Sequence, residues 1–289
     1  MRRFIGAAVM LAGLTVTAVL AQDAPITIKL KKAGAGETTK ETKTETGKTK
    51  VIVSIMGNDQ TKLEDTTASY AFTDEIIERA GPKGSKPTKL KRTYEKAELT
   101  KDGAKEDLGL DGKTVMIEKK SDGYVFLVNG KPLSGTAAEI LKKEFGAKKE
   151  TSEEDFLPEK PVKVGDSWKV NVEKAAAELA EGGMVIDPDK SKGTGKLTKV
   201  YQKNGKTYGI LEVEMDLVVT KIKGPQEIPL KDGSKLNIKI TMDGCIDGTE
   251  ATGGGKMSMK GNLAGELMGV GLSFNIDIGM VGNSVEVKK

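Results

Sequence analysis

Alternation of apolar and polar residues with a period of two runs through most of this chain and constrains its fold more than any other feature. Phe274, Ile276 and Ile278, for example, are separated by single polar residues. Side chains of a β-strand point alternately to its two faces, so each such segment predicts a strand with one buried face. The segments with this pattern are 26–31, 51–55, 113–119, 124–128, 196–201, 206–221, 236–242 and 272–280.

Turn signals between these segments favour hairpins. Asn129-Gly130 and Asn204-Gly205 are pairs that tolerate the positive φ angles of two-residue hairpin turns. Ser121-Asp122-Gly123 separates two alternating segments and also has the composition of a turn. These signals predict hairpins over 113–128 and 196–221.

The segment 38–50 contains only Thr, Lys, Glu and one Gly, a composition also typical of disorder. We nevertheless expect an exposed strand that continues through Gly47 into 48–56, because threonine favours pleated surfaces and the residues alternate. Its predicted faces are Thr42, Thr44 and Thr46 on one side and Glu41, Lys43 and Glu45 on the other.

Two helices are predicted between the strands. Thr136 and Glu139 have the spacing of a capping box, and apolar residues at helical spacing follow as far as a stop at Gly146. The second helix covers 173–181 and is capped by Asn171.

Long antiparallel strands with two short helices predict a mainly β protein, with a half-barrel-like curved antiparallel sheet or sheets whose concave face the helices cover. Glycines within strands mark bulges, strong coiling or close backbone approach, which a curved sheet uses. The second half is rich in them: Gly253, Gly254, Gly255, Gly261, Gly265, Gly269 and Gly271. The chain has 12 aromatic residues, which argues against the aromatic girdles of an outer-membrane barrel.

The N-terminus has the layout of a secretory signal peptide. Arg2 and Arg3 precede a mostly apolar stretch at 4–20, and cleavage is predicted between Ala21 and Gln22. No later apolar segment is long enough to span a membrane as a helix. We expect a bacterial protein that is periplasmic or secreted after cleavage.

The predicted organisation is a signal peptide at 1–21, a β-rich N-terminal half at 22–150 and a β-rich C-terminal half at 151–289. The boundary rests on a Lys-, Glu- and Pro-rich linker between the two predicted helices. Two separate domains and one continuous sheet both remain open.

Composition excludes several chemistries. The chain has no histidine and a single cysteine, so it has no Ser-His-Asp triad, imidazole metal ligand or intrachain disulfide. We predict no catalytic, cofactor-binding or metal-binding residue, no cofactor, and a non-enzymatic protein. The formal charge of +4 falls to +2 without Arg2 and Arg3, and the basic run at 86–92 is interpreted as a solvated strand face, so we expect no nucleic-acid partner.

Two acidic clusters are candidate cation sites. Asp187, Asp189 and Ser191 resemble the start of a calcium loop, but the required glycine and bidentate glutamate are missing, so a turn is favoured. Asp243 and Asp247 each precede a glycine and are also interpreted as turn residues, with Cys245 between them as a small buried hydrophobe.

Methionines gather in the glycine-rich half and adapt to irregular apolar surfaces. They either fill the core or line a cavity for an apolar ligand: Met215, Met242, Met257, Met259, Met268 and Met280. Trp168, the only tryptophan, is expected to anchor a strand that follows a Gly165-Asp166 turn.

The sequence Leu157-Pro158, followed by Lys163-Val164-Gly165-Asp166-Ser167-Trp168, resembles a motif of uncharacterised secreted bacterial proteins. The overall layout also resembles the half-barrel of periplasmic lipoprotein carriers, in which helices cover a concave apolar sheet. That resemblance implies an exported β-rich protein and carries over no catalytic residue.

Three functions are therefore considered. The first is an exported binding protein that carries a lipid or another apolar ligand on its curved sheet. The second is a structural or interaction protein of the bacterial cell envelope, with an envelope protein as partner. The third is a carboxylate-based hydrolase, which needs two acidic side chains about 5 to 10 Å apart in a cleft.

Overall fold

The structure is a computed structural model that describes residues 24–79, 86–146 and 153–287. The predicted signal peptide at 1–21, its cleavage site between Ala21 and Gln22, and the predicted boundary at 150/151 lie outside these ranges and stay predictions. Across the described ranges, no helix is both long and apolar enough to cross a membrane.

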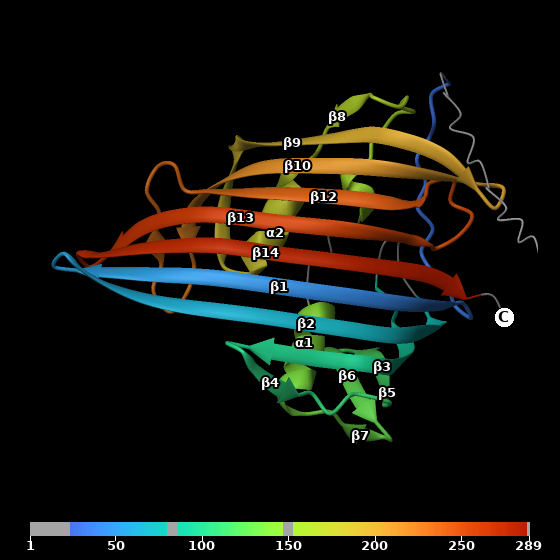
Figure 1. The fold of residues 1–289 in the computed structure, drawn as a ribbon, viewed down its shortest axis with the longest axis horizontal. Helices are drawn as coiled ribbons and strands as arrows, with labels where there is room; N and C mark the ends of the chain where they lie inside the picture. The colour runs from blue at the N-terminus through green and yellow to red at the C-terminus, as the bar shows by residue number, and fades with distance from the viewer. Residues whose placement is uncertain (1–23, 80–85, 147–152, 288–289) are drawn as a thin grey trace, which may run out of the picture.

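One open antiparallel sheet dominates the molecule (Figure 1), which confirms the predicted fold class. Its path runs β7-β6-β5-β3-β2-β1-β14-β13-β12-β10-β9-β8, with β4 beside β3 and β11 beside β10. The strands are β1 (Thr38–Ile55), β2 (Asn58–Glu78), β3 (Lys89–Lys101), β4 (Ala104–Asp107), β5 (Thr114–Lys120), β6 (Gly123–Val128), β7 (Lys131–Pro132), β8 (Ser167–Lys169), β9 (Met184–Lys203), β10 (Lys206–Ile222), β11 (Ile228–Pro229), β12 (Lys235–Cys245), β13 (Gly253–Leu267) and β14 (Val270–Val287).

The first and last long strands pair in the middle of the sheet. The β1–β14 ladder extends from Thr38 opposite Val287 to Ser54 opposite Gly271. Strands before β1 in the path come from the first half of the chain, and strands after β14 come from the second half. The two halves therefore form one continuous hydrogen-bonded sheet.

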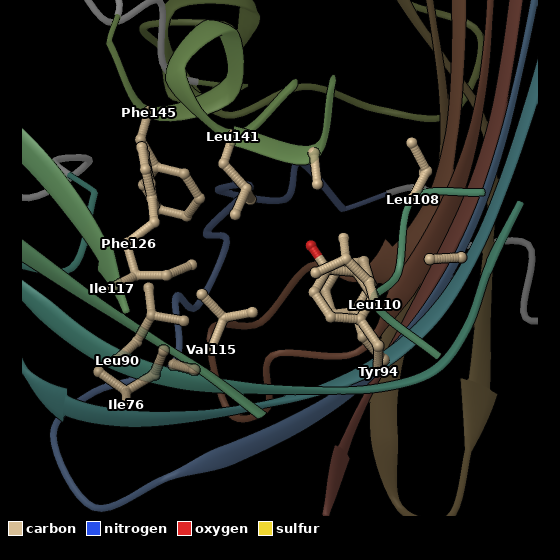
Figure 2. Packing of buried hydrophobic residues seen from close by; sticks show 14 residues of the cluster. Ile76, Leu90, Tyr94, Leu108, Leu110, Val115, Ile117, Phe126, Leu141 and Phe145 are labelled. Atoms are coloured by element: carbon tan, nitrogen blue, oxygen red, sulfur yellow. The ribbon is translucent and has the colours of Figure 1, made fainter. Parts of the chain in front are cut away.

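Both helices, α1 (Gly135–Phe145) and α2 (Val172–Glu181), lie on the same, concave, face of the sheet, behind the strands in Figure 1. Under α1, Leu141 and Phe145 pack onto Val115, Ile117 and Phe126 (Figure 2). This N-terminal core is the one expected for a helix whose apolar residues recur every three or four positions.

The C-terminal core lies beneath α2. Val172 and Ala175 of the helix pack with Met215, Leu217 and Leu236 of the sheet. A smaller cluster continues it toward one end of β9 and β10 and includes Ile28, Val162, Leu197, Val200, Leu211 and Ile246. Apolar burial in the molecule is thus divided between two regions of one face.

β1 lies between these two regions, which explains its polar sequence. The predicted strand at 38–50 is confirmed and continues through Gly47 to Ile55. Glu41 and Lys43 point to the concave face and are partly buried, whereas Thr42 and Thr44 are exposed on the convex face. The faces predicted from alternation are therefore those observed.

The predicted tight turns are also observed. Asn129 and Asn204 have φ angles of 51° and 52°, and each is followed by a glycine with positive φ. Positive φ at both central residues is the geometry of a type I′ hairpin turn. The pairs join β6 to β7 and β9 to β10.

The segment 26–31 forms no strand, contrary to prediction. Ile26 bridges Val162 and Lys29 bridges Asp247, and these two isolated bridges are its only pairings among the described residues. The two partners belong to different parts of the chain, so no ladder can extend. Ile28, between the two bridges, is buried, as the alternation of apolar and polar residues predicts.

The acidic segment at Asp187 and Asp189 was predicted as a turn but lies within β9. The register against β10 shifts here. Asp216 of β10 opposes Lys192, but Val218, two residues later, opposes Asp187, which lies five residues earlier in β9. The Asp187 carboxylate accepts hydrogen bonds from the backbone N–H of Asp189 and Lys190. A local turn is therefore present, as an irregular bulge inside a long strand rather than at its end.

The start of α1 also differs from prediction. The N-cap is Ser134 rather than Thr136, it makes no side-chain cap hydrogen bond, and the capping box with Glu139 is absent. The helix begins earlier because Gly135, with φ of 72°, turns the chain into it. At α2 the prediction is confirmed, since Asn171 Oδ1 accepts the N–H of Glu173 at 2.9 Å.

The motif that ends at Trp168 closes the outer edge of the C-terminal half. Gly165 has φ of 94°, and the Asp166 carboxylate accepts the Lys163 N–H at 2.8 Å, which forms the predicted turn. The Trp168 indole Nε1 donates to the Phe156 carbonyl at 2.8 Å and lies over Gly195 of β9. The indole thus anchors β8 as expected.

A side chain at Gly195 would collide with that indole, because a Cβ there would lie 2.2 Å from Trp168 Cε2. We expect Gly195→Ala to lower the free energy of unfolding by about 1–3 kcal/mol, since a rigid ring must move. In Gly282→Ala, the matched control in β14, the new Cβ would meet nothing nearer than 3.6 Å, so stability should be unchanged or slightly raised. Urea unfolding followed by circular dichroism checks both, and equal stability of the two variants would contradict this packing.

Candidate functional site: a concave cavity between two cores

A cavity of about 710 Å³ opens on the concave face where the two cores fail to meet. Its walls come from both halves of the chain. Phe72, Leu90 and Phe145 line it from the N-terminal half, and Leu211 and Ile240 line it from the C-terminal half. A volume of this size falls in the range of small-molecule sites.

Part of the sheet surface that lines this cavity consists of glycines and carries no side chains. Gly255 and Gly282 oppose each other in the β13–β14 ladder, and Gly282 also opposes Lys43 of β1. Both positions belong to the concave rows of their strands, where a larger residue would project a side chain into the cavity. The glycine-rich sequence of β13 and β14 therefore creates space as well as allowing close strand approach.

The methionines predicted as a possible lining are only partly brought together. Met242, Met257 and Met280 line the cavity, and Met257 directly opposes Met280 in the ladder. Met259 lies one concave position further along β13, partly buried against the C-terminal core.

Met215 and Met268 lie elsewhere. Met215 is 2% exposed and fills the C-terminal core beneath α2. Met268 is 83% exposed in the turn between β13 and β14 and does not join the others.

A buried ionic cluster forms the N-terminal wall of the cavity. Arg92 donates to both carboxylate oxygens of Asp74, from Nε and Nη2, each at 2.8 Å. Its Nη1 contacts both oxygens of Glu144 in α1 at 2.9 and 3.0 Å. The guanidinium also lies 3.8 Å from the centroid of the Phe72 ring. One arginine therefore ties β2, β3 and the end of α1 together.

The predicted solvated face at 86–92 is wrong for Arg92, which is 4% exposed. The signal that could have found it is the alternation Leu90, Arg92, Tyr94, in which all three side chains point to the concave face. Although burial disfavours its charge, the carboxylates of Glu144 and Asp74 raise the pKa of Arg92. Burial in turn raises the pKa of Asp74, against the opposing effect of Arg92.

Glu41 adds a carboxyl group to the cavity from β1. Its carboxyl group accepts a hydrogen bond from Thr39 Oγ1 at 3.2 Å. Burial and the nearby charge of Asp74 raise the pKa of Glu41 to about 7. A carboxyl group that is readily protonated near neutral pH therefore lies beside the methionine-lined wall.

The other acidic candidates have structural partners. Asp243 lies in β12 rather than in a turn and accepts the Tyr201 hydroxyl at 2.6 Å. Asp247 pairs with Lys29 in an isolated bridge just before a bend at Gly248. Although burial opposes it, hydrogen bonds from Thr207, Thr249 and Cys245 lower the pKa of Asp247. Cys245 is buried, as expected. Across the described ranges, no three His, Cys, Asp or Glu side chains are placed to hold a metal ion.

Removing the carboxylate of Asp74 should destabilise the protein strongly. Asp74→Asn leaves the buried Arg92 charge with Glu144 alone, and we expect a loss of about 3–5 kcal/mol in the free energy of unfolding. The matched control is Asp277→Asn, which removes an exposed ion pair with Lys260 (3.5 Å) and should cost at most about 1 kcal/mol. Urea unfolding measures both, and similar losses would show that the cluster is not a stabilising unit.

The raised pKa of Glu41 predicts a pH dependence of stability. An unfolded glutamate has a pKa of about 4.3, so between about pH 4 and pH 7 the folded state binds more protons. The stability contributed by protonated Glu41 is therefore complete below pH 4 and is lost as the pH rises toward 7. In Glu41→Gln this contribution does not titrate, while that of Asp74 remains in both proteins. The melting temperature of the variant should rise relative to the parent from pH 4 to pH 8, and a constant difference would contradict the assignment.

No protein-family model and no curated protein matches this chain. Among solved structures, the chain is weakly similar to a crystal structure of an outer membrane channel from Pseudomonas putida F1. The sequence identity is 8% and the TM-score is 0.23, over 90% of this chain and 98% of the channel chain. A likeness of this degree assigns no family and supports no argument about function.

Proposed function

We propose that the protein is a non-enzymatic binding protein that holds a lipid or another apolar ligand in the concave cavity. The observation that carries the proposal is the cavity itself, about 710 Å³ on the face that the helices flank. A sheet packed solid between α1 and α2 would have excluded this function. The proposed localisation of the protein, periplasmic or secreted, rests on the predicted signal peptide.

The two walls of the cavity suit a ligand with an apolar body and a polar end. Met257 and Met280 offer flexible thioether side chains, which adapt to irregular apolar shapes. Glu41 of β1 and Arg92 of β3 also line the cavity, where a hydroxyl, amide or charged group would find hydrogen-bond partners. This combination favours a lipid-like molecule over a compact polar metabolite.

The other two functions have less support. Hydrolysis by paired carboxylates needs two acidic groups free to exchange protons, but the cavity carboxylates of Asp74 and Glu144, which act on Glu41, are both engaged by Arg92. A role as an envelope interaction protein needs no internal space and leaves the cavity unexplained.

Polar substitutions in the lining should weaken ligand binding. Met257→Gln and Met280→Gln together place two amides against the ligand, and we expect the Kd for an apolar fluorescent probe such as N-phenyl-1-naphthylamine to rise by about tenfold or more. The matched control is Met268→Gln, because Met268 lies outside the cavity. Fluorescence titration in solution measures the Kd for each protein.

An equal loss of affinity in Met268→Gln would mean that the probe binds the exposed turn. Unchanged affinity in the double variant would rule out the methionine wall as the binding surface. Either result overturns the proposed site.

A further inference from the structure

Two hairpin turns at one end of the sheet expose apolar side chains. Met56 in the β1–β2 turn is 97% exposed and Met268 in the β13–β14 turn is 83% exposed. The strands that carry them are neighbours, since Ser54 opposes Gly271 at the end of the β1–β14 ladder. The two turns therefore lie side by side at the left end of the sheet in Figure 1. We call residues 55–58 and 267–270 the paired tips.

The residue choice at the paired tips is unusual for their backbone geometry. In the described ranges, each residue other than glycine with positive φ begins a two-residue hairpin turn and is followed by glycine: Met56, Asp102, Asn129, Asn204 and Met268. Asparagine and aspartate suit this conformation because their short polar side chains tolerate it, whereas methionine gains nothing there locally. Three turns follow this rule, and the two that break it are adjacent.

The paired tips also lack charge. Ile55-Met56-Gly57-Asn58 and Leu267-Met268-Gly269-Val270 contain no ionisable side chain. The other three turns are each flanked by a lysine: Lys101, Lys131, and both Lys203 and Lys206. The paired tips are exposed, apolar and uncharged, and they carry methionine where asparagine or aspartate would suit the turn better. This combination indicates that they contact an apolar environment outside the chain.

The size of the paired tips favours a lipid surface over a protein partner. Each tip has four residues, whereas a stable protein interface uses about 20–30 residues on each side. Insertion of a few apolar side chains into the boundary between headgroups and acyl chains gives reversible binding that grows with the apolar area buried. Two narrow projecting turns suit that kind of insertion.

An apolar row connects the paired tips with the cavity. On the concave face of β14 the side chains run from Met280 through Ile278, Ile276 and Phe274 to Leu272, next to the β13–β14 turn. All five are partly buried, and Phe274 and Ile276 pack against the C-terminal core. A ligand with an apolar body would thus have apolar contacts along the sheet between the two places.

We propose that the paired tips insert into a lipid surface and orient the sheet with its β1–β2 and β13–β14 turns toward the membrane. This docking goes beyond the proposed ligand binding and does not depend on occupancy of the cavity. It gives the exposed methionines a role that neither core packing nor turn geometry supplies.

The test uses the exported chain isolated from the periplasm of an expressing bacterium, with its mass checked, and vesicles of phosphatidylethanolamine and phosphatidylglycerol. Met56→Asn with Met268→Asn should reduce vesicle co-sedimentation by about tenfold or more, because both apolar insertions are lost. Asparagine suits the turn, so folding should be retained. The matched control adds Asn129→Met and Asn204→Met to that double variant. The amino-acid composition is then that of the parent, but the methionines lie in two other turns, so vesicle binding should not return.

Vesicle binding by the double variant equal to that of the parent would overturn the proposal, as would recovery in the matched control. So would loss of self-association, rather than of vesicle binding, in the double variant, because the tips would then contact a second copy. The cavity variant with Met257→Gln and Met280→Gln should bind vesicles like the parent. Failure of ligand binding and failure of membrane docking are therefore seen separately.

Discussion

The pairing of β1 with β14 is the constraint on which the rest of the structure depends. It joins the two ends of the described chain along a ladder from Thr38 to Ser54 and makes one sheet of the two halves. The concave side chains of β1 include Glu41, Lys43 and Glu45, which are costly to bury without partners. The two apolar cores consequently stop on either side of this strand, and the cavity occupies the space between them.

Arg92 holds the sheet and the helix together within the N-terminal half. Its guanidinium bonds to Asp74 in the sheet and to Glu144 in the last turn of α1, so it fixes the end of the helix at the cavity wall. A buried ion pair contributes little net stability compared with apolar packing, but it specifies one arrangement of the groups that it joins. The wall of the cavity is thereby defined by directional contacts on one side and by adaptable methionines on the other.

Period-two alternation and turn composition were sufficient to predict the fold class, most strands, both helices and the strand nature of the polar segment at 38–50. They failed where local and long-range signals conflict. Asp187-Pro188-Asp189 has the composition of a turn, yet pairing with β10 continues on both sides of it. Segment 26–31 alternates like a strand, yet its partners are two separate points.

The candidate site was less predictable because it depends on register. No local pattern brings Met257 opposite Met280 or places Gly282 beside Gly255, since these depend on how β13 and β14 align. The lysines around Arg92 indicate a solvated basic run, and only its place between Leu90 and Tyr94 indicates burial. The exposed position of Met268 follows from its location in a turn, which the gathering of methionines in sequence did not reveal.

The most direct test of ligand binding in the cavity is a native mass spectrum of the exported chain, purified from the periplasm without detergent, followed by solvent extraction of whatever is bound. We expect a stoichiometric apolar adduct that is released into the organic phase. A ligand-free mass that stays unchanged after incubation with envelope lipids would contradict it.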